Sequence, residues 1–501
     1  MGLDELIRKI ILPLFMAVSL KSYSQEDRKP NIIFFFVDDM GWQDTSVPFY
    51  KEVTKLNETY HTPNMQRLAQ EGLKFTQAYA TAVCSPSRIS LMTGMNAARH
   101  QVTNWTLRKN KSPDPVNKKI AAPEWNLNGL CSDTSVSQTV QASTLPQLLR
   151  DAGYKTIHVG KAHFGAKGTP GEEPLNLGFD VNIAGHAAGG PGSYYGKYNF
   201  SAKWRNGDAI WDIPGLEKYH GQDVYLTEVL TVEANKQIDK AVAENKPFYL
   251  YMSHYAIHAP WEKDGRYYKK YIDQGLSEFN AAYASMIEGM DKSLGDILDN
   301  VNKLGIAENT LILFMSDNGQ PKQAELNWPL RGHKLTPYEG GSRVPFIASW
   351  PGEIKHGTNT NDYIIIEDVF PTFLEVAGVE YKDKLIQKID AESFKPLLLG
   401  KNPQNRNRSV FWHFPHTYDH LPYSAVRKGD WKLIYHHLDQ HFELFDLAND
   451  ISEKENLAGQ DHARVKKLAK ILAEFLRTTE AGMPTLSKTG NPVPYPDDVI
   501  N

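Results

Sequence analysis

Four apolar segments of this chain each run directly into side chains that could take part in chemistry. The residues that follow these segments in the sequence are acids, an amide, a lysine and histidines: Asp38 and Asp39 after Asn31–Val37, Lys161 and His163 after 156–159, His254 and His258 after Phe248–Ser253, and Asp317 and Asn318 after 311–316. Each apolar segment has the length and composition of a buried strand. Ligands of open α/β sheets bind at the carboxyl ends of the strands, so the pattern predicts one shared site.

The chemistry that these residue types offer includes cation binding and proton transfer. Two pairs of oxygen-bearing side chains stand at two of the strand ends: Asp38 with Asp39, and Asp317 with Asn318. Either pair alone is more often a turn or a helix cap, but together they favour a metal, and their hard oxygens suit calcium better than zinc. Lys161 is a cation that could neutralise an anion, and His163 and His258 are candidates for proton transfer, because histidine ordinarily titrates near neutral pH. Taken singly, a lysine or a histidine is more often an ordinary surface or packing residue.

A fifth reactive element is the string Cys84-Ser85-Pro86-Ser87-Arg88. A cysteine at the start of a helix could be an activated thiolate. A helix N-terminus also favours a bound anion, because its backbone donors and its dipole both point toward the ligand. The alternative is a structural cysteine, bridged to Cys131.

The elements that must position these residues follow an α/β pattern. Helical patterns run from Thr62 to Gly72 and from an N-cap at Thr144 to about Gly153. Strands that alternate with helices imply a mostly parallel sheet covered by helices on both faces. We therefore expect an α/β fold with a large, mostly parallel sheet between helices, over a catalytic domain of residues 25–380.

The last quarter of the chain has a different pattern of apolar and polar residues. Short strand-like pieces at 410–414 and 431–435 alternate with polar turns, and residues 465–477 carry an apolar stripe at helical spacing. These features predict a smaller C-terminal subdomain, residues 381–501, made of an antiparallel sheet and a helix.

Composition excludes several classes of protein. The 501 residues include 55 Lys and Arg against 59 Asp and Glu, a net charge of −4, which excludes a nucleic-acid binder held mainly by phosphate contacts. A hydrophobic fraction of 41% is too high for a disordered chain. Two cysteines make neither a disulfide framework nor a four-cysteine zinc site.

The N-terminus resembles a targeting segment. Arg8 and Lys9 precede an apolar run over 10–20, and the small residues Ser22 and Ser24 follow. This order predicts a signal peptide over residues 1–24, with a soluble N-terminal helix as the alternative. The run is too short to span a bilayer and no later stretch is long and apolar enough. We expect an exported protein, periplasmic or secreted, without a membrane span.

Several motifs together resemble the formylglycine-dependent sulfatases. Cys84-Ser85-Pro86-Ser87-Arg88, followed by Thr93-Gly94, is similar to the C-x-P-S-R signature of that family. Its other motifs occur in order along the chain: 38–42 (DDMGW), 62–65 (TPNM), 160–165 (GKAHFG), 258–260 (HAP), 316–319 (SDNG), 332–334 (GHK), 338–345 (YEGGSRVP), 350–352 (WPG), 427–433 (RKGDWKL) and 443–447 (ELFDL). The resemblance covers residues 29 to 458.

The resemblance implies an alkaline-phosphatase-like fold and a sulfuric ester hydrolase. It implies that a formylglycine-generating maturase oxidises Cys84 to formylglycine. Calcium is then expected on an oxygen of the modified Cys84 and on the two oxygen pairs, that is Asp38, Asp39, Asp317 and Asn318. Arg88 would hold the hydrated aldehyde, and Lys161 and Lys334 would neutralise the sulfate oxygens.

The mechanism implied by the resemblance starts from the hydrated aldehyde of residue 84. One hydroxyl, deprotonated by Asp317, attacks sulfur in line. His258, helped by Lys334, protonates the departing alcohol oxygen. His163 then takes a proton from the second hydroxyl, which expels sulfate and restores the aldehyde. Five histidines have no assigned role: His254, His333, His413, His416 and His420.

For the substrate, the chain is similar to the polysaccharide sulfatases that Bacteroidetes secrete. This predicts a sulfated carbohydrate, either an algal polymer such as ulvan or carrageenan or a glycosaminoglycan. Long segments at 114–133 and 185–212 resemble functional loops. Side chains that could contact sugars there and in 413–423 include Tyr194, Tyr195, Trp204 and Trp211, with loop packing as the alternative.

Three other functions remain open from the sequence. The same site could belong to an arylsulfatase for small sulfates, or to a phosphonate monoester or phosphodiester hydrolase. A non-catalytic glycan-binding protein is the third, if Cys84 stays a thiol or pairs with Cys131.

Overall fold

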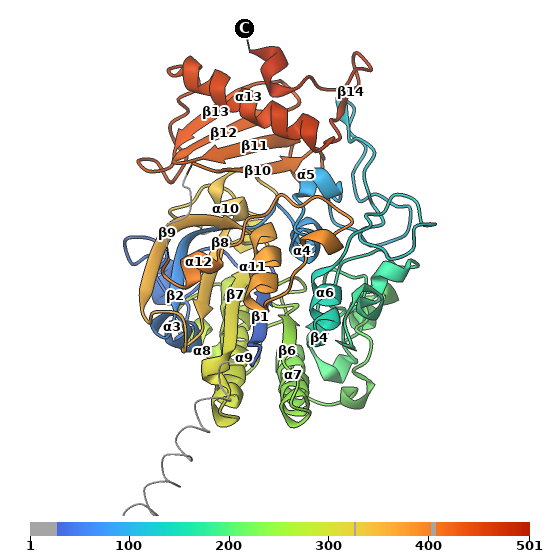
Figure 1. Ribbon diagram of the computed structural model, residues 1–501, viewed down its shortest axis with the longest axis vertical. Helices are drawn as coiled ribbons and strands as arrows, with labels where there is room; N and C mark the ends of the chain where they lie inside the picture. The colour runs from blue at the N-terminus through green and yellow to red at the C-terminus, as the bar shows by residue number, and fades with distance from the viewer. Residues whose placement is uncertain (1–27, 325–326, 402–406, 501) are drawn as a thin grey trace, which may run out of the picture.

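The computed structural model describes residues 28–324, 327–401 and 407–500, so the predicted signal peptide lies outside the described residues. The main body is an eight-stranded sheet in the order β5-β4-β6-β1-β7-β8-β2-β9 (Figure 1). Its strands are β1 (Asn31–Val37), β2 (Leu73–Tyr79), β4 (Lys155–Gly160), β5 (Val181–Ile183), β6 (Phe248–Ser253), β7 (Thr310–Ser316), β8 (Arg343–Ser349) and β9 (Thr358–Ile365). Only β8 runs antiparallel to its neighbours in this sheet, so the predicted large, mostly parallel sheet is confirmed.

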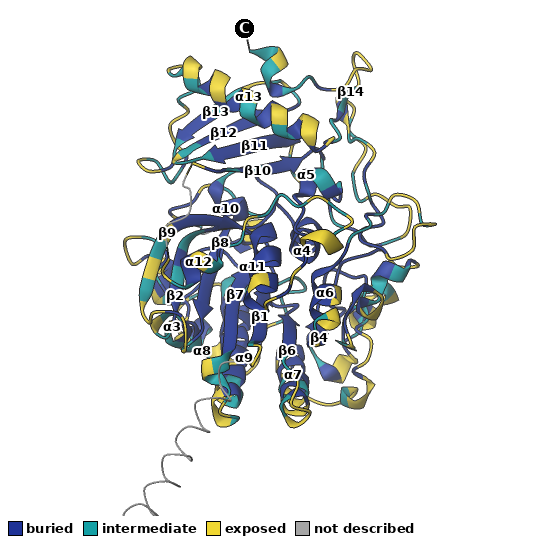
Figure 2. Cartoon of the chain, viewed as in Figure 1, coloured by how far each residue is buried: buried dark blue, intermediate teal, exposed yellow. Residues whose placement is uncertain are grey.

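Helices cover both faces of this sheet because its central strands are apolar on both sides. In β1, Phe34 and Phe36 belong to one core, whereas Ile33 and Phe35 belong to the other, as the alternation of side chains along a strand requires. The first core is completed by α4 (Cys84–Thr93), α6 (Leu145–Asp151) and α11 (Val369–Val376), and the second by α3 (Pro63–Gln70), α7 (Leu226–Ala243) and α9 (Glu278–Lys303). Figure 2 shows the strands buried between these layers.

The helix boundaries agree with the sequence signals. Thr144 caps α6, because its side chain accepts a hydrogen bond from the Gln147 amide. Helix α3 starts directly after Thr62 and ends at Gln70, two residues before the expected Gly72. Shorter helices are α2 (Lys55–Thr59), α5 (Ala97–His100), α8 (Tyr268–Asp273), α10 (Glu339–Ser342) and α12 (Lys395–Leu398).

A separate antiparallel sheet forms the C-terminal part, seen at the top of Figure 1. Its strands are β10 (Ser409–Phe414), β11 (Tyr423–Lys428), β12 (Trp431–His436) and β13 (Phe442–Asp446), and α13 (His462–Thr478) covers it. In β12, Leu433 packs with α13, whereas Ile434 belongs to the core of the large sheet. The small sheet therefore lies between α13 and the main body. The predicted sheet and helix are confirmed, and the domain limits at residues 25, 380 and 381 stay a prediction.

The two long segments expected to be loops are largely irregular. In the first, β3 (Ile120–Ala121) pairs with β14 (Thr485–Leu486), which ties the C-terminal tail to this loop. In the second, three 3-10 turns interrupt the chain: Gly196–Tyr198, Ala202–Arg205 and Ala209–Trp211. Among the described residues, no helix has both the length and the apolar character needed to cross a membrane.

Candidate active site

The strands that carry the candidate residues are consecutive in the sheet, in the order β4-β6-β1-β7, and all four are parallel. Their carboxyl ends therefore share one edge. Val37 pairs with Ser316, so the acidic residues that follow β1 and β7 emerge side by side. Gly160 pairs with Ser253, which brings the residues that follow β4 next to those that follow β6. The convergence predicted from the sequence is thus a consequence of strand order and register.

Arg88, on the first turns of α4, is fully buried and donates to three strand ends. Its Nε and Nη2 donate to Asp317 Oδ2 at 3.1 and 2.7 Å. Its Nη1 donates to the Lys161 carbonyl oxygen at 3.1 Å and to Ser253 Oγ at 2.6 Å. The guanidinium therefore positions Asp317 and ties α4 to the ends of β4 and β6.

The other two carboxylates each have a lysine partner. Lys161 Nζ donates to Asp38 Oδ2 at 2.6 Å, and Lys334 Nζ donates to Asp39 Oδ1. With the pair of Arg88 and Asp317, three carboxylates face three cations, so their formal charges balance. A divalent cation added to such a set leaves a net positive site, which attracts an anionic substrate.

The acidic residues also fit a metal ion. Oxygens of Asp38, Asp39 and Asp317 lie within 4.8 Å of one another. Asp38 Oδ1 and Asn318 Oδ1 are buried without a hydrogen-bond partner in the described part of the chain, and leaving such oxygens unsatisfied is costly. Burial and the neighbouring Asp317 raise the pKa of Asp38 well above its usual range. A cation at this point would satisfy both oxygens and favour the ionised carboxylate.

Cys84 is the first residue of α4 and is buried. Burial raises the pKa of its thiol, although Lys161 and Lys334 act in the opposite direction. This direction disfavours an unmodified, activated thiolate at Cys84. The suggested disulfide with Cys131 is wrong, because both cysteines are free thiols.

The two candidate histidines lie against the start of the 185–212 loop. A Cβ added at Gly189 would lie 2.4 Å from His163 Cε1, and one at Gly190 would lie 2.7 Å from His258 Nδ1. Only glycine allows the backbone to come this close to the two rings. These two positions were not singled out in the sequence, where they are part of a glycine-rich loop.

Hydrogen bonds assign the protons on both rings. His163 Nε2 lies 2.7 Å from the Thr106 carbonyl oxygen, which can only accept, so its buried Nδ1 carries the lone pair. His258 Nδ1 bonds the Ala259 carbonyl oxygen at 2.8 Å, which leaves Nε2, 4.0 Å from Asp39 Oδ2, as its basic atom. Burial and the nearby Lys161 and Arg88 lower the pKa of His163, and burial lowers the pKa of His258 to about 4. Both rings are therefore neutral near pH 7.

Other histidines noted in the sequence are part of the packing. His254 bonds Ser293 Oγ at 2.9 Å, His413 bonds Ser424 Oγ at 2.8 Å, and His416 bonds Asp114 Oδ2 at 2.8 Å, all of them buried. His333 and His420 are only partly buried. None of the first three points into the site, since each ring is held elsewhere.

Two further residues shape the site: Ser253, which was not singled out in the sequence, and Tyr194, which has another role there. Ser253 is the last residue of β6 and accepts from Arg88, and its place at a strand end was the only signal for it. For Tyr194 both sugar contact and loop packing were open, and the structure selects packing, because this side chain is fully buried. Its hydroxyl donates to the carbonyl oxygens of Tyr255 and His258, at 2.7 Å each, and so supports the His258 segment.

Of the aromatic residues predicted to contact sugars, Trp204 is 45% exposed, and Tyr195 and Trp211 are partly buried. Tyr198, which was not singled out in the sequence, is 40% exposed, and its ring stacks on Trp204 with centroids 5.5 Å apart. Lys197 Nζ lies 4.4 Å from the centre of the Tyr195 ring. In the 413–423 segment, by contrast, both end residues are buried, so only its middle reaches the surface.

The fold and the charged edge of the sheet place this protein among the alkaline-phosphatase-like hydrolases. Within them it belongs to the sulfatase family: the family model named Sulfatase matches residues 30–379. A second model, described as N-sulphoglucosamine sulphohydrolase, C-terminal, matches residues 333–481. The protein is therefore a sulfuric ester hydrolase, and the resemblance seen in the sequence is confirmed.

Known proteins support the same assignment. A sulfatase of Formosa agariphila is 29% identical in an alignment that covers 97% of this chain and 95% of the relative. The N-acetylgalactosamine-6-sulfatase of Canis lupus familiaris is 31% identical, with 86% of this chain and 76% of the relative covered. The solved structure of Ps i-CgsB in complex with k-i-k-neocarrahexaose is similar with a TM-score of 0.72 and 26% identity, over 90% of this chain and 93% of that one.

Proposed function

We propose that this sulfatase removes sulfate from a sugar of a sulfated polysaccharide or its oligosaccharides, using a formylglycine formed from Cys84 and a bound calcium ion. The observation that carries the proposal is the set of contacts around the start of α4, where Cys84 lies: Arg88 of the same helix donates to Asp317 and to the Lys161 carbonyl oxygen, and the Leu335 amide, next to Lys334, donates to the Ala82 carbonyl oxygen at 2.9 Å. Lys161 and Lys334 pair with Asp38 and Asp39, and both act against the rise that burial causes in the pKa of the Cys84 thiol. An anionic sulfate ester that reached this point would meet cations and a helix N-terminus.

The residues present would hold the calcium ion through Asp38, Asp39, Asp317 and Asn318. When bound, calcium would polarise a sulfate oxygen, and the formylglycine would supply the nucleophile. Arg88 keeps Asp317 in place through two hydrogen bonds to Oδ2.

The two histidines are proposed to move protons at different atoms. His163 presents a lone pair at the buried Nδ1, which suits a base. His258 would have to bind a proton at Nε2 to act as an acid. A sulfate ester nearby adds negative charge and raises the pKa of that ring, whereas Lys334 opposes protonation in its absence. His258 would thus become a proton donor when the substrate is present.

The exposed Tyr198 and Trp204 support a sugar substrate. They belong to the same loop whose Gly189 and Gly190 contact the catalytic histidines, so a chain extending from the site along this loop would reach them. Aromatic faces stack on apolar surfaces such as those of sugar rings, and Lys197 beside them could bind a further sulfate. The complex of Ps i-CgsB with k-i-k-neocarrahexaose favours a carrageenan-like substrate, and the mammalian relative favours a glycosaminoglycan.

Mass spectrometry of the tryptic peptide over residues 75–88 tests the nucleophile. Protein co-expressed with a formylglycine-generating maturase should give a peptide about 18 Da lighter than the cysteine form. Protein with an unmodified thiol despite the maturase would contradict the proposed chemistry. It would leave the calcium-dependent glycan binder as the better interpretation.

A substrate panel tests the proposed specificity. Matured enzyme would be assayed on sulfated algal and glycosaminoglycan oligosaccharides, on nitrophenyl sulfate and on phenylphosphonate. Release of sulfate from an oligosaccharide with a higher kcat/KM than from nitrophenyl sulfate is the expected result. The opposite order would favour an arylsulfatase, and preference for phenylphosphonate would favour a phosphonate hydrolase.

We also propose that residues 1–24 direct export, which would place the enzyme in the periplasm or outside the cell. Expression of the full chain followed by N-terminal sequencing of the exported protein tests this. A mature protein that begins after Ser24 is expected.

A further inference from the structure

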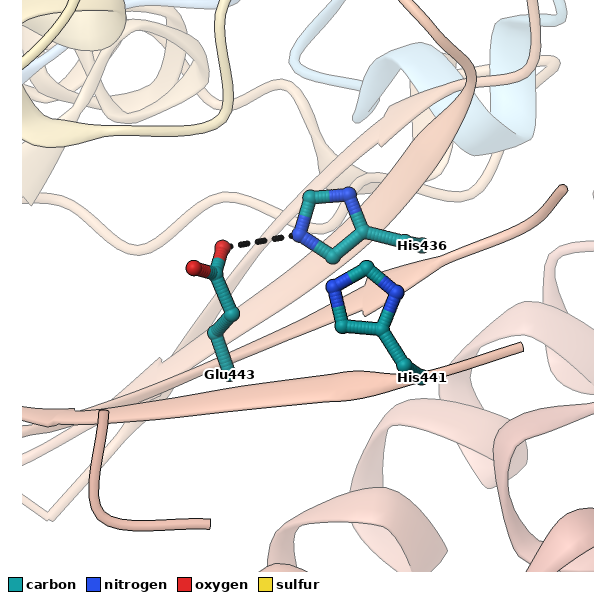
Figure 3. A group of neighbouring side chains, drawn as sticks. All are labelled: His436, His441 and Glu443. Carbon is teal, nitrogen blue, oxygen red and sulfur yellow. Dashed lines mark hydrogen bonds and ion pairs between the residues drawn. The ribbon is translucent and has the colours of Figure 1, made fainter. Parts of the chain in front are cut away.

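A second group of potential metal ligands lies far from the acidic cluster in sequence, on the hairpin of β12 and β13. His436 is the last residue of β12, His441 stands just before β13, and Glu443 is the second residue of β13. Two imidazole nitrogens and a carboxylate oxygen from these residues lie within 4.8 Å of one another (Figure 3). The side chains of His436 and Glu443 are only 12% and 13% exposed, so the group is sheltered.

The hydrogen bonds of this group aim its ligand atoms at one another. His436 Nε2 and Glu443 Oε2 are 2.8 Å apart, as the dashed line in Figure 3 shows. His441 Nδ1 bonds Asp439 Oδ1 at 2.7 Å. At His441 the carboxylate fixes the proton on Nδ1 and leaves Nε2 basic, which is the arrangement found behind metal-binding histidines. At His436 the proton on Nε2 that faces Glu443 is released to solvent when an ion takes its place, because metal ligands bind in the deprotonated form.

We propose that His436, His441 and Glu443 form a second cation site that binds a transition metal ion such as Zn²⁺, with Asp439 as the residue that orients His441. Two imidazoles and one carboxylate are a common ligand set for zinc, with water in the fourth position. Imidazole ligands favour ions of this kind, whereas the all-oxygen set at the strand ends favours calcium. The two sites therefore differ in the class of ion that they select.

The side chains need one adjustment to bind an ion. The rings of His436 and His441 are stacked, with centroids 4.2 Å apart and an angle of 4° between their planes. An ion must lie in the plane of each ring that binds it, so one ring has to turn. His441 is the ring that can do so, because its side chain is 49% exposed at the hairpin end, and its partner Asp439, 65% exposed, can move with it and keep the hydrogen bond. The same exposure gives an ion a path from solvent.

The proposed site is connected to the segment that carries Lys334. Glu443 Oε2 accepts a hydrogen bond from the Tyr338 hydroxyl at 2.9 Å, and its Oε1 lies 3.7 Å from Arg331 Nη1. The Arg331 guanidinium lies 3.7 Å from the centre of the Tyr338 ring. An ion on Glu443 would thus fix the hairpin against the 331–338 segment. This role is one of support, since none of these residues contacts the proposed nucleophile.

Binding of Zn²⁺ and Co²⁺ to the full chain tests the proposal. All proteins carry Cys84→Ser, because a thiol is itself a zinc ligand, and are saturated with Ca²⁺ to fill the oxygen site. Calorimetry measures Zn²⁺ affinity, and visible absorption of bound Co²⁺ reports nitrogen ligands. The variants are His441→Gln and Asp439→Asn, with His356→Gln, an exposed histidine before β9, as the matched control.

The expected result is one Zn²⁺ bound per chain in the Ca²⁺-saturated protein and in the His356→Gln control. Loss of that binding is expected for His441→Gln, and a decrease of about 10- to 100-fold for Asp439→Asn, as for other residues that orient metal ligands. Equal Zn²⁺ affinity in His441→Gln and the control would overturn the proposal, as would the absence of Zn²⁺ binding to the control. Thermal unfolding without metal shows whether His441→Gln is folded, so a folding defect is not mistaken for a lost ligand.

Discussion

Lys432 offers a sharp test of how the C-terminal sheet supports the catalytic body. This residue of β12 is fully buried, and its Nζ lies 3.0 Å from Glu339 Oε1 and 3.0 Å from Glu453 Oε1. Glu339 begins α10, five residues after Lys334, and its amide donates to Glu453 Oε2 at 2.7 Å. Burial raises the pKa of Glu453 to about 7, with Lys432 acting in the opposite direction. One lysine therefore holds two buried carboxyl groups together.

Replacing Lys432 with methionine should remove a charged hydrogen bond to Glu339 and an ion pair with Glu453 while keeping most of the side-chain volume. Hydrogen bonds to charged groups contribute about 1.5–3 kcal/mol each, and breaking a buried ion pair on one side costs about 3–5 kcal/mol. We expect Lys432→Met to lower the free energy of unfolding by about 3–5 kcal/mol. Arg343 still contacts Glu339 Oε2 at 3.2 Å, which keeps the loss at the lower end of that range.

A double variant separates lost charge from lost packing. Glu453→Gln in the Lys432→Met background removes the uncompensated carboxylate but keeps an oxygen for the Glu339 amide, so at least about 1 kcal/mol should return. Urea unfolding measures stability, and steady-state kinetics at saturating and low substrate separate kcat from KM. The reasoning fails if Lys432→Met costs less than about 1 kcal/mol, or if the double variant is no more stable than the single one.

Three further predictions follow from other parts of the structure. Burial raises the pKa of Glu367 to about 8 from an ordinary 4.5, so between pH 5 and 8 the folded state holds a proton that the unfolded state has lost, and the free energy of unfolding falls as the pH rises. Glu367→Gln should make the slope of the unfolding free energy against pH less negative by about 1.4 kcal/mol per pH unit, and an unchanged slope would refute this. For the proposed calcium site, a chelator should abolish activity and lower stability, and calcium restored at 100 times its Kd should return about 2.7 kcal/mol. Asp39→Asn should weaken that recovery. Trp204→Ala should lower kcat/KM about tenfold on a sulfated oligosaccharide and leave nitrophenyl sulfate unaffected; an equal loss on both would mean that Trp204 only supports the loop.

Much of the site could be predicted from the sequence because strand ends are local features. The continuous apolar run Asn31–Val37 needs burial on both faces, so the acids that follow it in the sequence, Asp38 and Asp39, must lie at the edge of the sheet where this strand ends. The same argument applied to Lys161 and to Asp317, and parallel pairing of β4, β6, β1 and β7 then brought these ends together. Thr144 likewise predicted the start of α6, because an N-cap depends only on residues a few positions apart in the sequence.

Contacts between distant segments could not be predicted in this way. From the sequence Tyr194 could either contact a sugar or pack within its loop, and only the folded chain shows its hydroxyl bonded to the His258 carbonyl oxygen. The partners of Arg88 come from β4, β6 and β7, and Lys432 meets Glu339 across 93 positions of sequence. The proposed hairpin ligands His436 and His441 could not be singled out either, because nothing in their spacing distinguishes them from surface histidines. The sequence by itself determined which residue types stand at the strand ends and at the start of α4, since local patterning fixes both. The tertiary structure alone decided which charged side chains form pairs and which polar side chains are removed from water, because burial and distance depend on how distant segments of the chain pack against one another.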